Sequence, residues 1–369
     1  MSSTTDNTTV DRTPSRTGAA ADTRARQLQV RGLSVRFRLP HATVEAVTDV
    51  SFDLEPGRCL ALVGESGCGK SVLVAALLGL LPGNADVAGT AVLSGPGGEL
   101  DLLRAPERVL ARQVRGRQVG LVPQSPTSHL TPVRTVRGQL EEVLRTLAPG
   151  ASRRGARTLP RRPHRRDRTA VRAAADATAR RAGLPPGALD HYPHELSGGM
   201  AQRAVTTLAL AGDPWLLLAD EPTTGLDRPL VEHTLDELRR LTEQGAAVLL
   251  ITHDLDAAAR VADNVAVMYA SRVVERGPVE QVMTRPHHPY ARGLLDALPR
   301  NGFRPVPGLA PELSALPAGC TFAPRCGRET ATCSSRPTLA AVRPRAHHDD
   351  TADQSPLQQD HLVACHHPC

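Results

Sequence analysis

The alternation of hydrophobic and polar positions between residues 28 and 57 predicts β-strands with one buried face. The alternation is clearest over residues 28–37 and 46–54. One face of an antiparallel sheet can meet solvent while the other packs on a core, which produces this pattern. We therefore predict antiparallel strands in this part of the chain.

Three continuous apolar runs predict a second kind of strand, one that is buried on both faces. They span residues 59–63, 215–219 and 247–251. A glycine-rich loop follows the first run, and charged residues follow the other two. Because these runs alternate with helical stretches, such as the apolar residues 72–81, we expect an α/β domain with a parallel sheet that binds ligands at its strand ends.

The bulk composition sets limits on the function. Aromatic residues make up 2% of the 369 residues, so we expect an aliphatic core. No apolar run reaches the ~20 residues of a membrane span, and residues 1–22 lack the apolar segment of a secretory signal. A role at a membrane would therefore need partner proteins. The net charge of +6 permits contact with nucleic acid or an anionic membrane surface but requires neither.

One basic residue differs from all the others. Lys and Arg total 44, and Lys70 is the single lysine among them. It lies in a loop that matches the pattern G-x-x-x-x-G-K-S/T, with an apolar strand before it and an apolar helix after it. The loop consists of Gly64, Glu65, Ser66, Gly67, Cys68, Gly69, Lys70 and Ser71.

The residue types of this loop suit a phosphate site. Glycines let the backbone wrap closely and turn several N–H groups toward phosphate oxygens. Lys70 would neutralise the β- and γ-phosphates as a compact point charge, and Ser71 would offer its hydroxyl to Mg²⁺. The helix that follows would point its positive end at the anion. The sequence therefore predicts a site for ATP with Mg²⁺.

Two further motifs fit a nucleotide site. Asp220 and Glu221 follow the second buried run, where one carboxylate can hold Mg²⁺ and its neighbour can polarise the attacking water. Taken alone, such a pair is also compatible with capping at a strand end. Ser197 and Gly199 open a helical pattern whose N-terminus can bind an anion, although a lone Ser-Gly-Gly is more often a helix cap.

Together these motifs resemble the ABC ATPases. That family has the phosphate loop, a glutamine after an apolar strand (here Gln124), the Leu-Ser-Gly-Gly signature, the Asp-Glu pair and a histidine (here His253), in this order and spacing. The resemblance covers about residues 28–338. It implies a P-loop NTPase fold of the α/β class with an antiparallel β subdomain and a helical signature subdomain, followed here by a short cysteine-containing C-terminal extension.

The resemblance also implies roles for individual residues. Gln124 would bind Mg²⁺ and sense the membrane subunit, and His253 would contact the γ-phosphate. Ser197 and Gly199 would bind the γ-phosphate of ATP held by a second ATPase subunit, so the chain would have to pair. Asp227 would lie in the loop that crosses between the two subunits.

The chain departs from the family pattern at two positions. The family stacks adenine on an aromatic residue before its second strand, and His41 stands at that position, where it would stack more weakly. Ala201 replaces the basic residue often found after the signature, which would weaken contacts between two subunits. Neither change removes a catalytic group, so we expect the chain to hydrolyse ATP.

Several segments resemble more specifically the ATPases of oligopeptide, dipeptide and nickel importers. They are residues 123–132, 191–199, 288–295, 307–308 and 319–326. The last three lie in a tail that ATP hydrolysis does not need, so they indicate the branch of the family. The resemblance implies two membrane permease subunits and an extracytoplasmic solute-binding protein as partners, with this chain at the cytoplasmic face of the membrane.

The tail contains four cysteines that could act together. They are Cys320, Cys326, Cys333 and Cys365. Four thiolates can hold a structural Zn²⁺ or an iron–sulfur cluster, although the short C-x2-C spacing of ordinary zinc sites is missing. Unligated cysteines are the alternative, and Cys369 or the pair His366 and His367 could compete as the last ligand. The resemblance to peptide importers favours a 4Fe–4S cluster.

These expectations divide the chain into segments. Residues 1–27 would be a disordered tail, 28–278 the ATPase domain with a helical subdomain at about 125–210, and 279–369 the C-terminal extension. Residues 151–168 form an arginine-rich insertion within the helical subdomain. Such a run is either a solvated segment or a contact site for nucleic acid or lipid headgroups.

Two other functions remain open beside the importer. A soluble ABC ATPase that acts on nucleic acid or ribosomes would suit the basic charge, but such proteins usually carry two ATPase domains, coiled coils or zinc modules. The sequence shows none of these, so we expect no nucleic-acid partner. A regulatory subunit that binds nucleotide without turnover conflicts with the presence of Glu221 and His253. The sequence does not separate peptides from nickel or metal chelates as the cargo, nor a homodimer from a heterodimer.

Overall fold

The computed structural model describes residues 27–95, 97–148, 165–342 and 361–369. Its strands are β1 Leu28–Arg38, β2 Thr43–Leu54, β3 Cys59–Val63, β4 Ala85–Gly95, β5 Gly98–Asp101, β6 Val119–Val122, β7 Leu216–Asp220, β8 Ala247–Thr252, β9 Asn264–Tyr269, β10 Arg272–Pro278, β11 Ala340–Ala341 and β12 Leu362–Val363. Its helices are α1 Lys70–Leu77, α2 Glu107–Val109, α3 Val136–Leu147, α4 Arg165–Arg181, α5 Gly198–Ala209, α6 Arg228–Glu243, α7 Leu255–Val261, α8 Val279–Thr284 and α9 Pro289–Asp296.

Two of the sequence predictions concern residues outside the ranges that the structure describes. The disordered tail and most of the arginine-rich insertion lie outside the described residues, so both stay predictions. The domain boundaries also stay predictions. Within the described ranges, no helix is both long enough and apolar enough to cross a bilayer.

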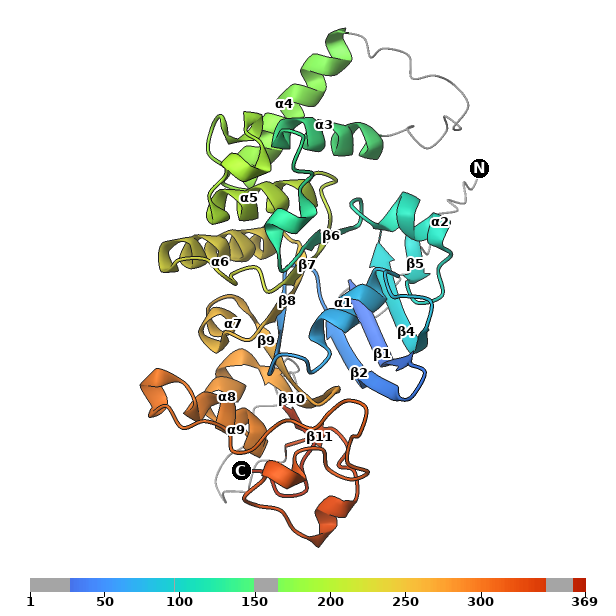
Figure 1. Ribbon diagram of the computed structural model, residues 1–369, viewed down its shortest axis with the longest axis vertical. Helices are drawn as coiled ribbons and strands as arrows, with labels where there is room; N and C mark the ends of the chain where they lie inside the picture. The colour runs from blue at the N-terminus through green and yellow to red at the C-terminus, as the bar shows by residue number, and fades with distance from the viewer. Residues whose placement is uncertain (1–26, 96, 149–164, 343–360) are drawn as a thin grey trace, which may run out of the picture.

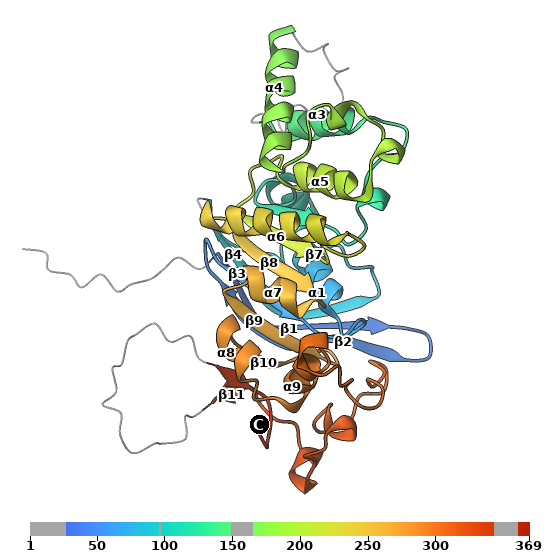
Figure 2. The ribbon, with the colours of Figure 1, turned by 90° about the vertical axis from the view of Figure 1, so that its left-hand side faces the viewer.

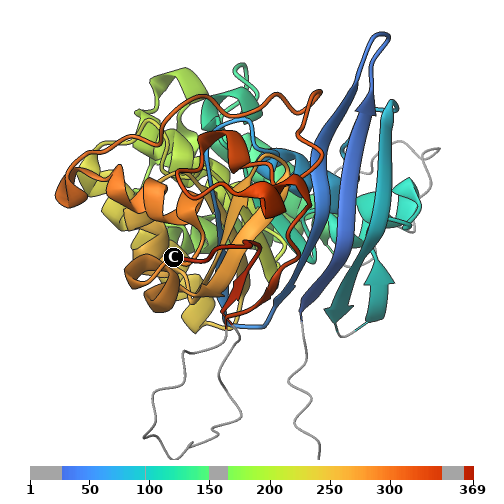
Figure 3. The same cartoon turned by 90° about the horizontal axis from the view of Figure 1, so that it is seen from below.

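The predicted antiparallel strands form a four-stranded sheet in the order β2-β1-β4-β5. Leu28 pairs with Leu54 at one end of the β1–β2 ladder, and Arg38 pairs with Thr43 at the other. Alternate side chains of β1, including Leu28 and Val30, are fully buried. The sheet forms a layer of its own beside the larger sheet (Figure 3). The alternating pattern thus predicted the strands and their buried face correctly.

The second sheet has the order β11-β12-β10-β9-β3-β8-β7-β6. The pairs among β9, β3, β8, β7 and β6 are parallel, as the apolar runs predicted. The strands beyond β9 are antiparallel, so the sheet is mixed. Ala270 and Ser271 join β9 to β10 in a tight turn with φ values of 43° and 71°, and a two-residue turn can only connect antiparallel strands.

Aliphatic side chains fill both faces of the larger sheet. The helix α1 lies between the two sheets, where its Leu73 and Leu77 pack with residues of β1, β2, β7 and β8. The helices α6, α7 and α9 cover the opposite face (Figures 1 and 2). Because α1 begins where β3 ends, this packing holds the start of α1 at one edge of the sheet.

A separate helical layer extends beyond the sheet at the top of the molecule (Figure 1). It contains α3, α4 and α5, which pack around a smaller aliphatic cluster that includes Val136, Leu140 and Ala204. The signature motif opens α5 within this layer. The layer matches the helical subdomain that the resemblance implied.

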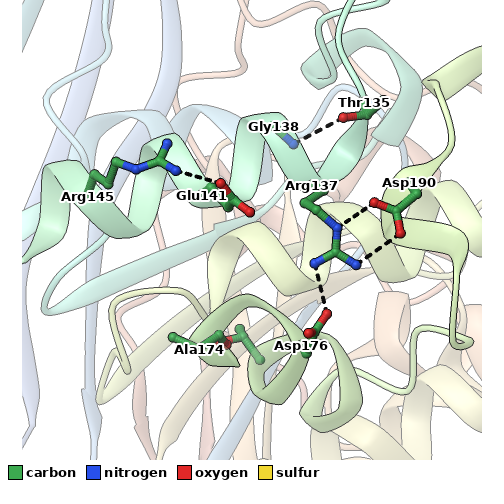
Figure 4. A network of polar contacts seen from close by, with 9 residues as sticks. Thr135, Arg137, Gly138, Glu141, Arg145, Ala174, Asp176 and Asp190 are labelled. Carbon is green, nitrogen blue, oxygen red and sulfur yellow. Dashed lines mark hydrogen bonds and ion pairs between the residues drawn. The ribbon is translucent and has the colours of Figure 1, made fainter. Parts of the chain in front are cut away.

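A half-buried arginine links the elements of the helical layer (Figure 4). Arg137 of α3 donates from Nη1 to Asp176 of α4 at 2.8 Å and from Nη2 to Asp190 at 3.1 Å. Its side chain is 12% exposed. The hydrogen bond from Arg137 holds the pKa of Asp190 below its usual range. One guanidinium therefore joins three segments that are distant in sequence.

The end of the chain returns to the larger sheet. Val363 of β12 pairs with Glu275 of β10, whose carboxylate is fully buried. That carboxylate accepts hydrogen bonds from the backbone N–H groups of His287 and His288 at 2.7 and 2.8 Å, and it lies 2.6 Å from Nε2 of His361. These contacts fasten the C-terminal extension to the ATPase sheet.

The Arg137 network leads to a prediction about stability. Arg137→Met should lower the free energy of unfolding by about 2 kcal/mol at pH 7, because it removes hydrogen bonds between charged groups in a half-buried setting. Since the Asp190 pKa is depressed in the folded state, this loss should be complete above about pH 4 and shrink as the pH falls below it. Urea unfolding followed by circular dichroism would measure it. Arg134→Met, which removes an exposed ion pair with Glu142, is the control and should change stability by less than about 1 kcal/mol.

Candidate nucleotide site

The parallel pairing brings the predicted site residues to one edge of the larger sheet. Val63 at the end of β3 pairs with Thr252 at the end of β8, and Asp220 at the end of β7 pairs with Ile251. The residues that follow these strand ends therefore lie side by side. They are Gly64 after β3, Glu221 after β7, His253 after β8 and Gln124 two residues after β6.

The phosphate loop has a backbone that requires glycine. Gly64 and Gly69 have φ values of 154° and 108°, which other residues rarely adopt. A Cβ atom on Gly64 would lie 2.1 Å from the Met268 carbonyl oxygen, and one on Gly69 would lie 1.9 Å from the Ala46 carbonyl oxygen. The loop is thus tightly enclosed by β9 and β2.

Lys70 lies inside the loop that precedes it. Its Nζ donates to the carbonyl oxygens of Gly64 at 2.7 Å and Glu65 at 3.0 Å, and the residue is 6% exposed. Lys70 is also the first residue of α1, whose N-cap Gly69 offers no side-chain hydrogen bond to the first turn. The positive charge of Lys70 and the uncapped N–H groups of the first turn of α1 therefore lie close together, an arrangement that suits the binding of a phosphate group.

Asp220 has the environment of a cation ligand. It is 9% exposed, and its Oδ1 atom has no hydrogen-bond partner among the described residues. Burial raises the pKa of this carboxyl above its usual range, the Ser71 hydroxyl opposes the rise by hydrogen bonding, and the charge of Glu221 adds to it. A buried carboxylate oxygen without a partner, beside a hydroxyl, fits the oxygen ligands that Mg²⁺ takes.

Glu221 and His253 form a pair next to Asp220. Oε2 of Glu221 lies 2.8 Å from Nδ1 of His253 and accepts a hydrogen bond from the Thr224 hydroxyl at 3.3 Å. Glu221 itself adopts a φ of 50°, and its N–H donates to the Ile251 carbonyl. A buried carboxylate beside an exposed imidazole can orient a water molecule at the open side of the site.

Three other predicted residues lie at exposed positions. Gln124 is exposed after β6. Ser197 is the N-cap of α5, where its side chain accepts from the Met200 N–H at 3.3 Å, and Asp227 is the N-cap of α6, where its side chain accepts from the Leu230 N–H at 3.1 Å. Gly199 packs directly against the Leu230 side chain, so the two helix starts are neighbours.

The signature and the phosphate loop lie in different layers of the chain. The helix α5 belongs to the helical layer, whereas α1 lies between the two sheets (Figures 1 and 2). His41 is exposed in the turn between β1 and β2, where its suggested contact with adenine stays a prediction. The chain therefore assembles the phosphate loop, the acidic pair and His253 at one edge, and presents the signature elsewhere.

The four tail cysteines do not form a metal site in the described residues. No group of three or more His, Cys, Asp or Glu side chains there is arranged to hold a metal ion. The four thiols are free, and the Cys320 N–H donates to the Cys333 carbonyl. Burial raises the pKa of Cys320, and it raises that of Cys365 to about 11. The prediction of a 4Fe–4S cluster is thus unsupported by this geometry.

Sequence reasoning missed two residues beside the phosphate loop. Tyr290 and Arg325 both come from the C-terminal extension and contact Glu65. The sequence signal was weak, because Arg325 is one of two arginines between Cys320 and Cys333 and nothing distinguished it from Arg328. Nothing in the sequence showed that this segment returns to a loop 260 residues earlier.

The position of Lys70 leads to a prediction about binding. Lys70→Arg should weaken MgATP binding at least about tenfold, because a planar guanidinium is too large for the enclosed Nζ position between two carbonyl oxygens. Isothermal titration with MgATP would measure the change. Arg36→Lys on the exposed side of β1 is the control and should bind normally. Equal affinities for the wild type and Lys70→Arg would show that Lys70 does not contact the phosphates.

Comparison with known families agrees with this geometry. The family described as "ABC transporter" matches residues 47–224, and the family described as "Oligopeptide/dipeptide transporter, C-terminal region" matches residues 274–333. A peptide import ATP-binding protein of Brucella melitensis is 41% identical over 330 residues, covering 85% of this chain and 94% of the relative. The oligopeptide transport ATP-binding protein OppD of Haemophilus influenzae is 39% identical over 320 residues, covering 85% and 93%.

Solved structures show the same fold. A dimeric ATP-binding cassette in a post-hydrolysis state, bound to ADP and Pi, superposes with a TM-score of 0.57 at 22% identity, covering 68% of this chain and 98% of the cassette. CbiO1 of Clostridium perfringens, part of the ABC transporter complex CbiONQ, gives a TM-score of 0.54 at 25% identity, covering 70% and 91%. The predicted ABC ATPase fold is confirmed. The chain therefore belongs to the family of ABC transporter ATPases and carries the C-terminal region of the oligopeptide and dipeptide transporters.

Proposed function

We propose that this chain is the ATP-hydrolysing subunit of an importer for peptides, working at the cytoplasmic face of a membrane on separate permease subunits. The observation that carries the proposal is the meeting of Lys70, Asp220 and the Glu221–His253 pair at one sheet edge. Residues 274–333 support the peptide branch, because they match the C-terminal region described for oligopeptide and dipeptide transporters, and relatives named for peptide and oligopeptide transport are about 40% identical. These similarities favour peptides over nickel or metal chelates.

Each residue of the site has a role in the proposed reaction. Lys70 and the N–H groups at the start of α1 bind the β- and γ-phosphates. Ser71, Asp220 and Gln124 would hold Mg²⁺, which neutralises phosphate charge when bound. Glu221 orients the attacking water at the γ-phosphate and polarises its O–H bond.

His253 has two roles in this arrangement. Its Nδ1 lies 2.8 Å from the Glu221 carboxylate and fixes the direction of that side chain. Its exposed ring edge faces solvent, where it can contact the γ-phosphate of bound ATP. The contact between Glu221 and His253 thus links two parts of the reaction. It connects the position of the Glu221 carboxylate, which orients the water, to the γ-phosphate, which the water attacks.

The separation of the signature from the phosphate loop supports action as a pair of ATPase subunits. Ser197 and Gly199 start α5 in a different layer from Lys70, so they are placed to complete a site on another subunit. Asp227 at the start of α6 adjoins the same surface, since Gly199 packs on Leu230. Closure of two such subunits on ATP, and reopening after hydrolysis, would drive the permeases. A solute-binding protein would deliver the peptide from outside.

The catalytic role of Glu221 is tested by removing its charge. Glu221→Gln should lower the kcat for ATP hydrolysis at least about 100-fold while MgATP still binds, because the amide cannot polarise the attacking water. Hydrolysis by the chain with its partner subunits, followed as phosphate release, measures this. Glu232→Gln on the exposed side of α6 is the control and should retain full activity. Turnover by Glu221→Gln at the wild-type rate would refute the assignment.

The importer function is tested separately from hydrolysis. Tagged chain should co-purify with integral membrane proteins, and a peptide-loaded solute-binding protein should raise the ATPase rate of the complex reconstituted in liposomes. The same complex should respond to peptides and not to nickel salts. Recovery of ribosomes or nucleic acid in place of membrane proteins would favour the soluble ATPase instead.

A further inference from the structure

An arginine from the C-terminal extension binds the phosphate loop directly. Arg325 lies in the one-turn 3-10 helix Ala323–Arg325, and its side chain is 5% exposed. Its Nη1 and Nη2 atoms donate to the two carboxylate oxygens of Glu65 at 3.0 and 3.1 Å. This is the bidentate geometry in which arginine binds carboxylates most firmly. Glu65 is the second residue of the phosphate loop, so the pair joins two segments that are 260 residues apart in sequence.

The position of Arg325 is fixed on every side. Its Nε donates to the Pro307 carbonyl at 2.7 Å, and Nη1 also donates to the Tyr269 hydroxyl at 3.3 Å. The guanidinium carbon lies 5.6 Å from the Tyr269 ring centre and 5.9 Å from that of Phe322. Only 2% of the chain is aromatic, yet Tyr269, Tyr290 and Phe322 pack together here with ring centres 4.4 to 5.5 Å apart. A guanidinium in such a setting loses little freedom when it binds Glu65.

The same extension holds the main chain of Glu65. The hydroxyl of Tyr290, a fully buried residue, accepts a hydrogen bond from the Glu65 N–H at 3.0 Å. The Glu65 carbonyl in turn accepts from Nζ of Lys70 at 3.0 Å. A continuous set of contacts therefore runs from the extension, through the side chain and backbone of Glu65, to the lysine of the phosphate loop.

We propose that Arg325 and Tyr290 are positioning residues for ATP binding, which hold Glu65 so that the phosphate loop and Lys70 keep the shape that receives the phosphates. The proposal rests on the proposed role of Lys70. The physical reason is entropic. Glycine residues allow a loop more backbone conformations than other residues do, and losing that freedom on binding would weaken the affinity for ATP. A loop that is already held at Glu65 loses less freedom when ATP arrives.

The chemistry of the pair favours this role over simple attachment of the tail. An apolar side chain of similar size could fill the space beside Tyr269 and Phe322 without the desolvation penalty that a buried charge carries. The contacts between Glu275 and the backbone of His287 and His288 already fasten the extension to the sheet. The bond between Arg325 and Glu65 adds a restraint on the phosphate loop that those contacts do not provide.

The experiment compares Arg325→Met with Arg328→Met in the complex with partner subunits. Arg328 lies three residues away, is exposed and donates to the Pro368 carbonyl, so its replacement removes an equal charge from the same segment. We expect Arg325→Met to raise the KM for MgATP about tenfold while kcat stays within about twofold, because the loss is in binding. Arg328→Met should leave both values unchanged. Arg325→Lys, which keeps the charge but not the two parallel bonds, should recover part of the affinity.

Glu65→Gln keeps the size of the side chain and tests the same contact from the other end. It should raise KM by a similar factor, and combining it with Arg325→Met should raise KM no further, as expected of two residues in one contact. This double-mutant comparison shows whether the two losses of affinity arise from one contact, because losses at two independent sites would add. Unchanged KM in Arg325→Met and Glu65→Gln, in a complex whose wild type hydrolyses ATP, would overturn the inference and leave the proposed function intact. A wild type without ATPase activity would overturn the proposed function itself.

Discussion

The parallel pairing of β3 with β8, and of β8 with β7, is the constraint on which the rest of the site depends. Parallel strands end at the same edge, so the phosphate loop, the acidic pair and His253 become neighbours although they are up to 189 residues apart in sequence. The helix α1 packs between two sheets and fixes where its N-terminus points. The proposed catalytic residues can contact one another at this edge, because each comes one or two residues after the end of a buried strand.

Acidic and basic side chains lie close together at that edge of the sheet. Asp220 and Glu221 are both largely buried and adjacent, which would be unfavourable without compensation. Lys70 and the Ser71 hydroxyl lie on one side of Asp220, and His253 lies on one side of Glu221. One Asp220 oxygen nevertheless has no partner within the described part of the chain. A buried carboxylate oxygen without a partner is unfavourable, so a divalent cation bound there would stabilise this edge of the sheet.

The pattern of apolar residues and glycines along the sequence predicted much of this fold. It could not predict contacts between residues that are far apart in the sequence. The buried strands at residues 59–63 and 247–251 were visible because apolar runs report burial on both faces, and the glycines of the loop were visible because only glycine adopts those φ values. The antiparallel addition of β12 to β10 was not visible, since β12 has two residues and no pattern of its own. The bond between Arg325 and Glu65 was hidden for a similar reason, because charged residues carry no signal of a partner 260 positions away.

The geometry of the signature shows how a helix cap and a phosphate contact can coexist on one side chain. The Ser197 hydroxyl uses one lone pair to accept from the Met200 N–H, which leaves its O–H free to donate. A hydroxyl at the exposed start of α5 can therefore keep the helix capped and still donate to the phosphate of a second subunit. Asp227, an acceptor only, caps α6 beside it and cannot bind phosphate in that way. In the proposed pair of subunits, Ser197 and the backbone at Gly199 would contact the nucleotide, with Asp227 beside them at the start of α6.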